Sequence, residues 1–139
     1  MKSFIYQALS AVYTKPYILF GHSFGTRLAF ESALHQTRQD NPPRHMICSG
    51  ARALHLHNHA DPIHELPNND FAEKLGQMGG TPEIIIKNKE LMNLLIPMLR
   101  ADFELSYSHT VDQTTCFDFP ATILYGTRDK RTPLEAVYA

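Results

Sequence analysis

One stretch of twenty residues, Tyr17 to Gln36, constrains the fold of this chain more than any other. It begins with the apolar run Tyr17 to Phe20, bounded by Pro16 and Gly21, which is typical of a strand buried on both faces of a parallel sheet. From Thr26 onward, a helix of about three turns is indicated by apolar spacing. Its apolar positions are Leu28, Ala29, Ala33 and Leu34, whereas Arg27, Glu31 and Gln36 fall on other faces.

Between this strand and this helix lies the pentapeptide Gly21-His22-Ser23-Phe24-Gly25, which is a GxSxG motif. The motif predicts a strained turn that raises the serine hydroxyl above the sheet edge, and both glycines are expected to permit close packing of strand and helix. The helix amides and dipole point at Ser23, and the backbone N–H of Phe24 is placed to donate to a tetrahedral oxyanion. We interpret the motif as a nucleophile elbow; the alternative is a glycine-rich turn with an inert serine.

Composition narrows the class of protein. With 139 residues, 43% hydrophobic and 19% charged, the chain is neither disordered nor membrane-like. Thirteen basic and fourteen acidic residues give a net charge of −1, which argues against a nucleic acid or a membrane as partner. Two cysteines, Cys48 and Cys116, are too few for a disulfide framework and fit a reducing cytoplasm, where we expect both to be small core residues.

The N-terminal residues are interpreted as a helix and not as a secretion signal, because polar residues interrupt the apolar run. One helical face carries Phe4, Ile5, Ala8, Leu9 and Val12. We expect this face to pack beside the strand that starts at Tyr17. A doubly wound sheet normally has several strands before its nucleophile strand, and no such strands precede it in this sequence.

Two further strands are predicted, at His45 to Gly50 and at Phe119 to Gly126. A helix between two strands makes a right-handed parallel unit, so the fold class is α/β with a parallel sheet and flanking helices. Thr127, Arg128 and Asp129 follow the last strand at its C-terminal end. Active-site groups of open α/β sheets gather at that end.

The segment at about 52–115 is too long for a simple crossover, and we interpret it as a helical lid inserted into one domain that covers 1–139. A capped helix is predicted to start at Asn68-Asn69-Asp70 and to stop at Gly79-Gly80, and Thr81-Pro82-Glu83 opens another. Asn88 to Leu99 is rich in Met and Leu, and Ala101 to Leu105 continues the amphipathic pattern. These apolar residues either seal the lid onto the sheet or line an acyl channel, and both possibilities stay open.

The chain resembles the type II thioesterases, the editing enzymes of nonribosomal peptide and polyketide synthesis. The resemblance covers nearly the whole chain in family order. Two blocks of the lid, Gly79 to Pro82 and Leu95 to Phe103, discriminate most, because GxSxG alone also admits lipases, esterases and peptidases. The matching blocks are Gly21 to Gly25, Cys48 to Arg52, His64 to Asn68, Gly79 to Pro82, Leu95 to Phe103, and Tyr125 to Asp129.

This resemblance implies part of an α/β-hydrolase fold that cleaves acyl groups from the phosphopantetheine arm of acyl or peptidyl carrier proteins. Ser23 is then the nucleophile, and Asp129 is the acid that orients the catalytic histidine. No cofactor is implied, because the substrate itself carries the phosphopantetheine. The alternatives are a non-catalytic remnant, a carrier-protein-binding module, or another serine esterase or lipase of the superfamily.

The chain departs from the family pattern at the catalytic histidine, which is expected well beyond Asp129, whereas no histidine follows Asp129 here. The upstream loop that supplies a second oxyanion donor is also not found. We therefore expect the chain to correspond to an internal fragment of the family fold that is inactive by itself.

The eight histidines of the chain offer no evident replacement for that base. His22 is expected to leave the turn away from Ser23, and His109 is expected at the surface. The cluster His55, His57, His59 and His64 raises the possibility of a zinc site. Because no Cys or carboxylate stands at ligand spacing, we favour a solvated loop and expect no metal.

Overall fold

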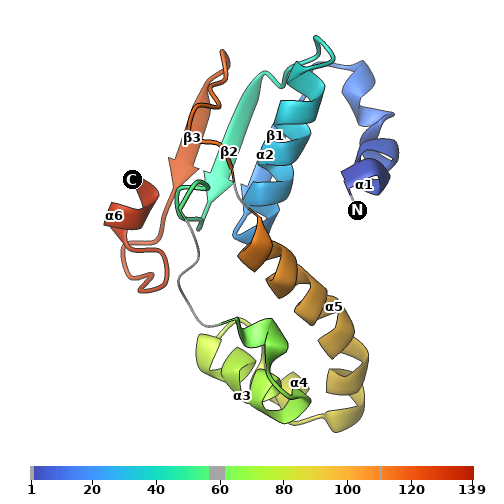
Figure 1. Cartoon of the computed structure of the whole chain (residues 1–139), viewed down its shortest axis with the longest axis vertical. Helices are drawn as coiled ribbons and strands as arrows, with labels where there is room; N and C mark the ends of the chain where they lie inside the picture. The colour runs from blue at the N-terminus through green and yellow to red at the C-terminus, as the bar shows by residue number, and fades with distance from the viewer. Residues whose placement is uncertain (1, 57–61, 110) are drawn as a thin grey trace. The chain divides into compact units, whose positions relative to one another are not determined.

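The computed structural model describes residues 2–56, 62–109 and 111–139 (Figure 1). The chain divides into two compact units. The first consists of Met1–Leu56 together with Thr110–Ala139, and the second is His57–His109. The second unit falls within the insertion predicted at about 52–115.

The first unit contains a three-stranded parallel sheet in the order β1-β2-β3 (Figure 1). The strands are β1 (Ile18–His22), β2 (His45–Ser49) and β3 (Ala121–Leu124). All three predicted strands are present, although β1 extends two residues beyond the predicted run and β3 is shorter at both ends. Gly21 is in register with Cys48, and Cys48 with Ile123, so the C-terminal ends of the strands share one edge of the sheet.

Helix α2 (Phe24–Thr37) covers one face of this sheet. Its buried side chains Ala29, Phe30 and Ala33 pack with Met46 and Cys48 of β2 to form the core of the unit. The helix begins two residues before the predicted start. One polar position was wrongly placed on an outer face: Gln36 is buried, and its side-chain oxygen accepts a hydrogen bond of 3.4 Å from Asn41.

The other face of the sheet exposes apolar side chains. Ile18 and Phe20 of β1 are 58% and 62% exposed, and Leu124 of β3 is 48% exposed. The prediction that β1 is buried on both faces is therefore wrong for this structure. An apolar run indicates that a strand is suited to burial. Whether the strand is buried depends on which other elements pack against its two faces.

The N-terminal helix α1 (Lys2–Leu9) packs against α2, where the Tyr6 ring stacks on His35 with 3.7 Å between ring centroids. Our expectation that this helix packs beside β1 is wrong in that respect. Val12 also lies outside α1, in the short 3-10 helix η1 (Val12–Thr14), and it is exposed. At the C-terminus, α6 (Leu134–Val137) is tied to the loop after β2, because the Ala53 N–H donates to the Ala136 carbonyl at 2.7 Å.

The second unit is helical and has its own core. It contains η2 (Ile63–Glu65), α3 (Asn68–Met78), α4 (Glu83–Ile86) and α5 (Lys89–Ser108). The buried residues of its core are Phe71, Leu75, Met92 and Ile96. Arg100 of α5 donates to the carbonyls of His64 and Leu66 and to the side chain of Asn68, and its guanidinium lies 4.8 Å from the centre of the Phe71 ring.

The helix ends in this unit follow the predicted signals only in part. Helix α3 stops at Gly79, whose φ of 75° is the left-handed conformation that favours glycine. Its N-cap is Pro67, without a side-chain hydrogen bond, so the predicted Asn-Asn-Asp cap is wrong. Thr81-Pro82-Glu83 leads only into the four-residue α4, and α5 has a separate cap, in which Asn88 Oδ1 accepts from the Leu91 N–H at 3.1 Å.

The Met and Leu residues of α5 divide into two groups. Met92 is buried in the core of this unit, whereas Leu94 is 77% exposed and Met98 is also largely exposed. Exposed apolar side chains on one helix are suited to contact an apolar surface or an apolar ligand. The exposed group suits both predicted roles, sealing a lid and lining an acyl channel.

Candidate active site

Ser23 occupies a strained turn between β1 and α2. Its φ of 51° and ψ of −120° lie outside the regions that non-glycine residues commonly adopt. The Ser23 N–H donates to the Ser49 carbonyl at 2.7 Å, and the Ser23 carbonyl accepts from the Thr26 N–H at 3.0 Å. The strained turn predicted from GxSxG is confirmed, and the serine is exposed to solvent.

The two glycines of the motif have different roles. A Cβ at Gly21 would lie 2.5 Å from the Gly25 carbonyl oxygen and 2.5 Å from the Thr26 Cα, which are backbone atoms that cannot yield easily. Thr26 closes this junction, because its buried hydroxyl donates to the Gly21 carbonyl at 3.0 Å. A Cβ at Gly25 would meet no described atom within 4 Å. The expectation that both glycines are needed for packing therefore holds only for Gly21.

Phe24 is the first residue of α2, so its backbone N–H belongs to the first turn, where amides have no acceptor within the helix. The positive end of the helix dipole coincides with this turn. The position is suited to an N–H that donates to an oxyanion formed at Ser23.

Asp129 lies on the turn after β3, and its carboxylate is held by its own loop. Oδ1 accepts from the backbone N–H of Arg131 at 2.9 Å and from that of Thr132 at 3.3 Å. These hydrogen bonds, first that from Arg131, lower the pKa of the Asp129 carboxyl. Because His22, Ser49 and Leu124 are in register, Ser23 and Asp129 both follow strand ends at the same edge of the sheet.

Four of the described histidines, namely His22, His35, His45 and His64, contact partners other than Ser23. His22 and Ser49 share a hydrogen bond of 3.0 Å between Nδ1 and Oγ, so the imidazole turns away from Ser23 as expected. Three further partnerships are His35 with Tyr6, His45 Nε2 with Thr122 Oγ1 at 2.8 Å, and, in the second unit, His64 with the Tyr107 ring.

A metal centre receives no support from the described residues, none of which form a group of three or more His, Cys, Asp or Glu placed to hold an ion. His57 and His59 of the considered zinc cluster lie outside those residues. Cys48 is buried, and burial raises the pKa of its thiol. Cys116 is exposed, so the expectation of two core cysteines is wrong for Cys116.

Two arginines contribute positive charge near the start of α2. Arg27 donates to the Leu54 carbonyl at 3.4 Å. Burial lowers the pKa of the Arg27 guanidinium, and the neighbouring charge of Arg52 lowers it further. The Nε of Arg52 is buried and has no hydrogen-bond partner among the described residues.

Sequence reasoning missed the part played by Ser49 and Gly50. They were noted only as the end of a predicted strand and as members of a family block, whereas Ser49 contacts both His22 and the Ser23 backbone. The signal that was available is their position directly after the strand paired with β1, where a parallel neighbour reaches the elbow.

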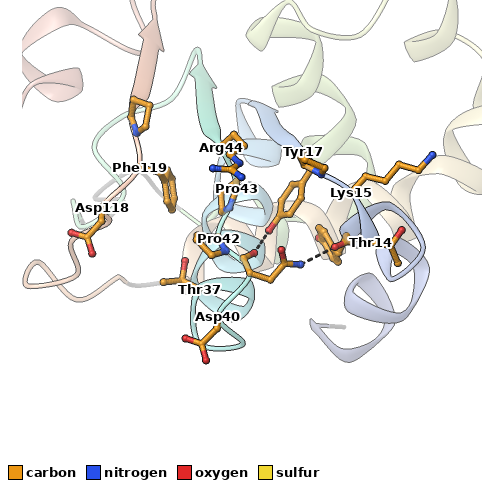
Figure 2. A pocket seen from close by; sticks show the side chains of 14 residues that line it. Thr14, Lys15, Tyr17, Thr37, Asp40, Pro42, Pro43, Arg44, Asp118 and Phe119 are labelled. Carbon is orange, nitrogen blue, oxygen red and sulfur yellow. Dashed lines mark hydrogen bonds between the residues drawn. The ribbon is translucent and has the colours of Figure 1, made fainter.

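A hollow of about 610 Å³ opens at the opposite edge of the sheet (Figure 2). It is lined by residues that precede the strands, including Pro16, Pro43 and Pro120, and by the segment after α2. Here Tyr17 donates its hydroxyl hydrogen to the Asn41 carbonyl at 2.6 Å, and Asn41 Nδ2 donates to the Tyr13 carbonyl at 2.8 Å. Because the hollow lies before the strands and Ser23 lies after β1, it is not an acyl pocket for that serine.

A family model described as the thioesterase domain matches residues 3–138. The chain belongs to the thioesterase family. None of the described helices combines the length and the apolar character needed to cross a bilayer.

Individual family members are consistent with this assignment. Linear gramicidin dehydrogenase LgrE of Brevibacillus parabrevis is 34% identical over 127 residues, which are 88% of this chain and 48% of that relative. The RedJ thioesterase of the prodiginine biosynthetic pathway in Streptomyces coelicolor superposes with a TM-score of 0.86 at 29% identity, over 99% of this chain and 54% of that one. YbtT, a type II thioesterase from the yersiniabactin NRPS/PKS biosynthetic pathway, superposes with a TM-score of 0.84 at 31% identity, over 99% of this chain and 57% of that one.

The thioesterase chain thus spans about half the length of these relatives. It carries part of the α/β-hydrolase fold, a small parallel sheet with flanking helices, as the sequence predicted. Its similarity to type II thioesterases of nonribosomal peptide and polyketide pathways is confirmed.

Proposed function

We propose that the complete protein hydrolyses acyl groups from the phosphopantetheine arm of acyl or peptidyl carrier proteins, with Ser23 as nucleophile. The observation that carries this proposal is the strained elbow, in which an exposed serine with φ of 51° stands at the N-terminus of α2. The thioesterase family assignment supports the same reaction class. YbtT is a type II thioesterase from an NRPS/PKS biosynthetic pathway, and its similarity to this chain favours synthases of nonribosomal peptides or polyketides as the source of the acyl units.

In this proposal, Ser23 Oγ attacks the thioester carbonyl while a histidine base accepts its proton. The carbonyl oxygen becomes an oxyanion, to which the Phe24 N–H donates a hydrogen bond. The carbon–sulfur bond then breaks, and the pantetheine thiol leaves with the proton from the histidine. A water molecule, activated by the same base, hydrolyses the acyl-serine ester, and Asp129 orients the base throughout.

We place the histidine base outside this sequence, because the family pattern expects it well beyond Asp129 and no histidine follows that residue here. Four of the histidines present, His22, His35, His45 and His64, also have other partners. A serine hydroxyl without a positioned base is a weak nucleophile near neutral pH. The chain by itself is accordingly proposed to be inactive. No cofactor or metal takes part, since the carrier protein brings the pantetheine.

The second unit is proposed to act as the lid that contacts the acyl chain. Its exposed Leu94 and Met98 offer apolar surface of the kind that an acyl group needs. A carrier protein is the proposed partner, and the cytoplasm, which suits two free cysteines, is the proposed location.

The test is Ser23→Ala in the complete protein, assayed by thiol release from acyl-pantetheine and from an acylated carrier protein. We expect the rate to fall by about four orders of magnitude or more, because the covalent route is lost. Ser108→Ala, on the last residue of α5, is the control and should leave the rate unchanged.

Two other outcomes would point to the alternatives. Hydrolysis of oxygen esters without hydrolysis of thioesters would indicate another serine esterase or lipase. Carrier-protein binding without any turnover would indicate a non-catalytic binding module.

A further inference from the structure

Ser49, at the end of β2, contacts the elbow through both its backbone and its side chain. Its carbonyl oxygen accepts the Ser23 N–H at 2.7 Å, and its hydroxyl oxygen lies 3.0 Å from Nδ1 of His22. His22 is also its partner in strand register. One residue of the neighbouring strand therefore holds the nucleophile and the residue directly before it.

Gly50 leaves space for this arrangement. Its φ is 55°, and a Cβ at this position would lie 3.0 Å from Cε1 and 3.4 Å from Nδ1 of the His22 ring. A larger residue would therefore press on the imidazole that reaches Ser49. The Gly50 N–H donates to the Leu124 carbonyl at 2.9 Å, which anchors this part of the backbone to β3.

A strained residue such as Ser23 keeps its conformation only when the surrounding contacts fix it. On its C-terminal side, Ser23 is fixed by α2 through the Thr26 N–H. On its N-terminal side, β1 ends with His22, so the contacts of that residue decide how firmly the strained peptide is held.

We propose that His22 and Ser49 form a latch, the side-chain hydrogen bond between the ends of β1 and β2, that holds Ser23 in its reactive conformation. Both are positioning residues that act through Ser23. The proposal rests on the proposed function for its kinetic consequence: because the latch orients the nucleophile without contacting substrate, its loss should lower kcat and leave KM unchanged.

The experiment measures two properties of the complete protein carrying Ser49→Ala. The first is the hydrogen-exchange rate of the Ser23 amide, resolved by NMR or by electron-transfer mass spectrometry. We expect this rate to rise about fivefold, as the loss of one hydrogen bond predicts. The second is the turnover of acyl-pantetheine, for which we expect kcat to fall about tenfold at constant KM.

Three further variants show whether any effect comes from the latch. Ser49→Thr keeps the hydroxyl and should restore most of both properties. His22→Ala breaks the same hydrogen bond, and because His22 is exposed, the substitution should not disturb the core. The double variant with Ser49→Ala should show almost the same exchange rate and kcat as either single variant. Thr122→Val is the matched control, because it breaks the corresponding histidine–hydroxyl pair with His45 and should change neither property.

An unchanged Ser23 exchange rate in both Ser49→Ala and His22→Ala would overturn the proposal, as would additive effects in the double variant. Failure of the proposed function is separable from this result. If the unmodified protein hydrolyses no thioester, the proposed function fails, while the exchange rates still decide whether the latch exists.

Discussion

Ser23 combines a positive φ with solvent exposure and a position directly before the first turn of a helix. A non-glycine residue in a strained conformation has an energetic cost that the remaining fold must offset. Such strain is concentrated at functional sites, and here it is found at the one serine that the GxSxG motif singles out.

Asp129 and Asp112 provide a matched pair for testing the proposed acid. In each, Oδ1 accepts hydrogen bonds within its own loop, and in each these bonds lower the carboxyl pKa. We expect Asp129→Asn to lower kcat of the complete protein about a thousandfold, because only Asp129 is proposed to orient the base. Asp112→Asn should leave kcat unchanged.

The rates of thioester hydrolysis by the two variants test whether Asp129 is the acid of the site. The loss in Asp129→Asn should remain smaller than that in Ser23→Ala, since Asp129 makes no bond to substrate. Equal kinetics for Asp129→Asn and the unmodified enzyme would place the acid at another residue.

At the scale of elements, the junction of β1 and α2 depends on Gly21 much more than on Gly25. Gly21→Ala should lower the free energy of unfolding by about 1–3 kcal/mol, because its Cβ would overlap the backbone of Gly25 and Thr26. Gly25→Ala should not lower the free energy of unfolding and can raise it by up to about 1 kcal/mol, because the added Cβ has open space and alanine favours a helix. Urea unfolding of the complete protein measures both, and equal losses for the two variants would contradict this account of the junction.

Tyr17, directly before β1, should make the protein less stable in alkali. Burial, with a smaller contribution from Tyr13, raises the pKa of Tyr17 to about 12. The unfolded tyrosine titrates near pH 10. The stability that the neutral Tyr17 side chain contributes to the fold is therefore complete below about pH 10 and is lost as the pH rises through about 12.

Tyr17→Phe should remove that alkaline dependence and lower stability near neutral pH by about 1 kcal/mol, through loss of the hydrogen bond to Asn41. The measurement is urea unfolding at pH 8, 10 and 11. Tyr138→Phe, at an exposed tyrosine, is the control that should follow the unmodified protein. Parallel pH profiles for Tyr17→Phe and the unmodified protein would refute the assignment to Tyr17.

The elements also show what the sequence reveals and what it does not. The three strands and the elbow were predictable, because apolar runs and GxSxG are local signals. The exposed face of β1, the burial of Gln36 and the contact of Ser49 with the elbow were not. Each of these depends on which segments meet in space, and a local pattern carries no information about that.

At the scale of the whole molecule, the first unit presents an unusual surface for a parallel sheet. Parallel sheets are normally covered on both faces, whereas Ile18, Phe20 and Leu124 are exposed here, and β1 is an edge strand in the described structure. Exposed apolar side chains beside an unpaired edge favour association.

We therefore expect the 139-residue chain, expressed by itself, to be marginally stable, prone to association and inactive. Ile18→Thr combined with Phe20→Thr should reduce association while keeping residues that favour strands. Light scattering after gel filtration and thermal unfolding followed by circular dichroism test this. A monomer that unfolds cooperatively and hydrolyses thioesters through Ser23 would contradict the expectation.

Ser23 is proposed to become acylated during turnover, and this step can be tested by trapping the acyl-enzyme. The complete protein is mixed with an acyl-pantetheine thioester, quenched in acid within the first turnover, digested and analysed by mass spectrometry. We expect the peptide containing Ser23 to gain the mass of the acyl group minus one hydrogen, with Ser23 as the modified residue. Thioester turnover with the acyl group on a different residue, or undiminished turnover after Ser23→Ala, would contradict it.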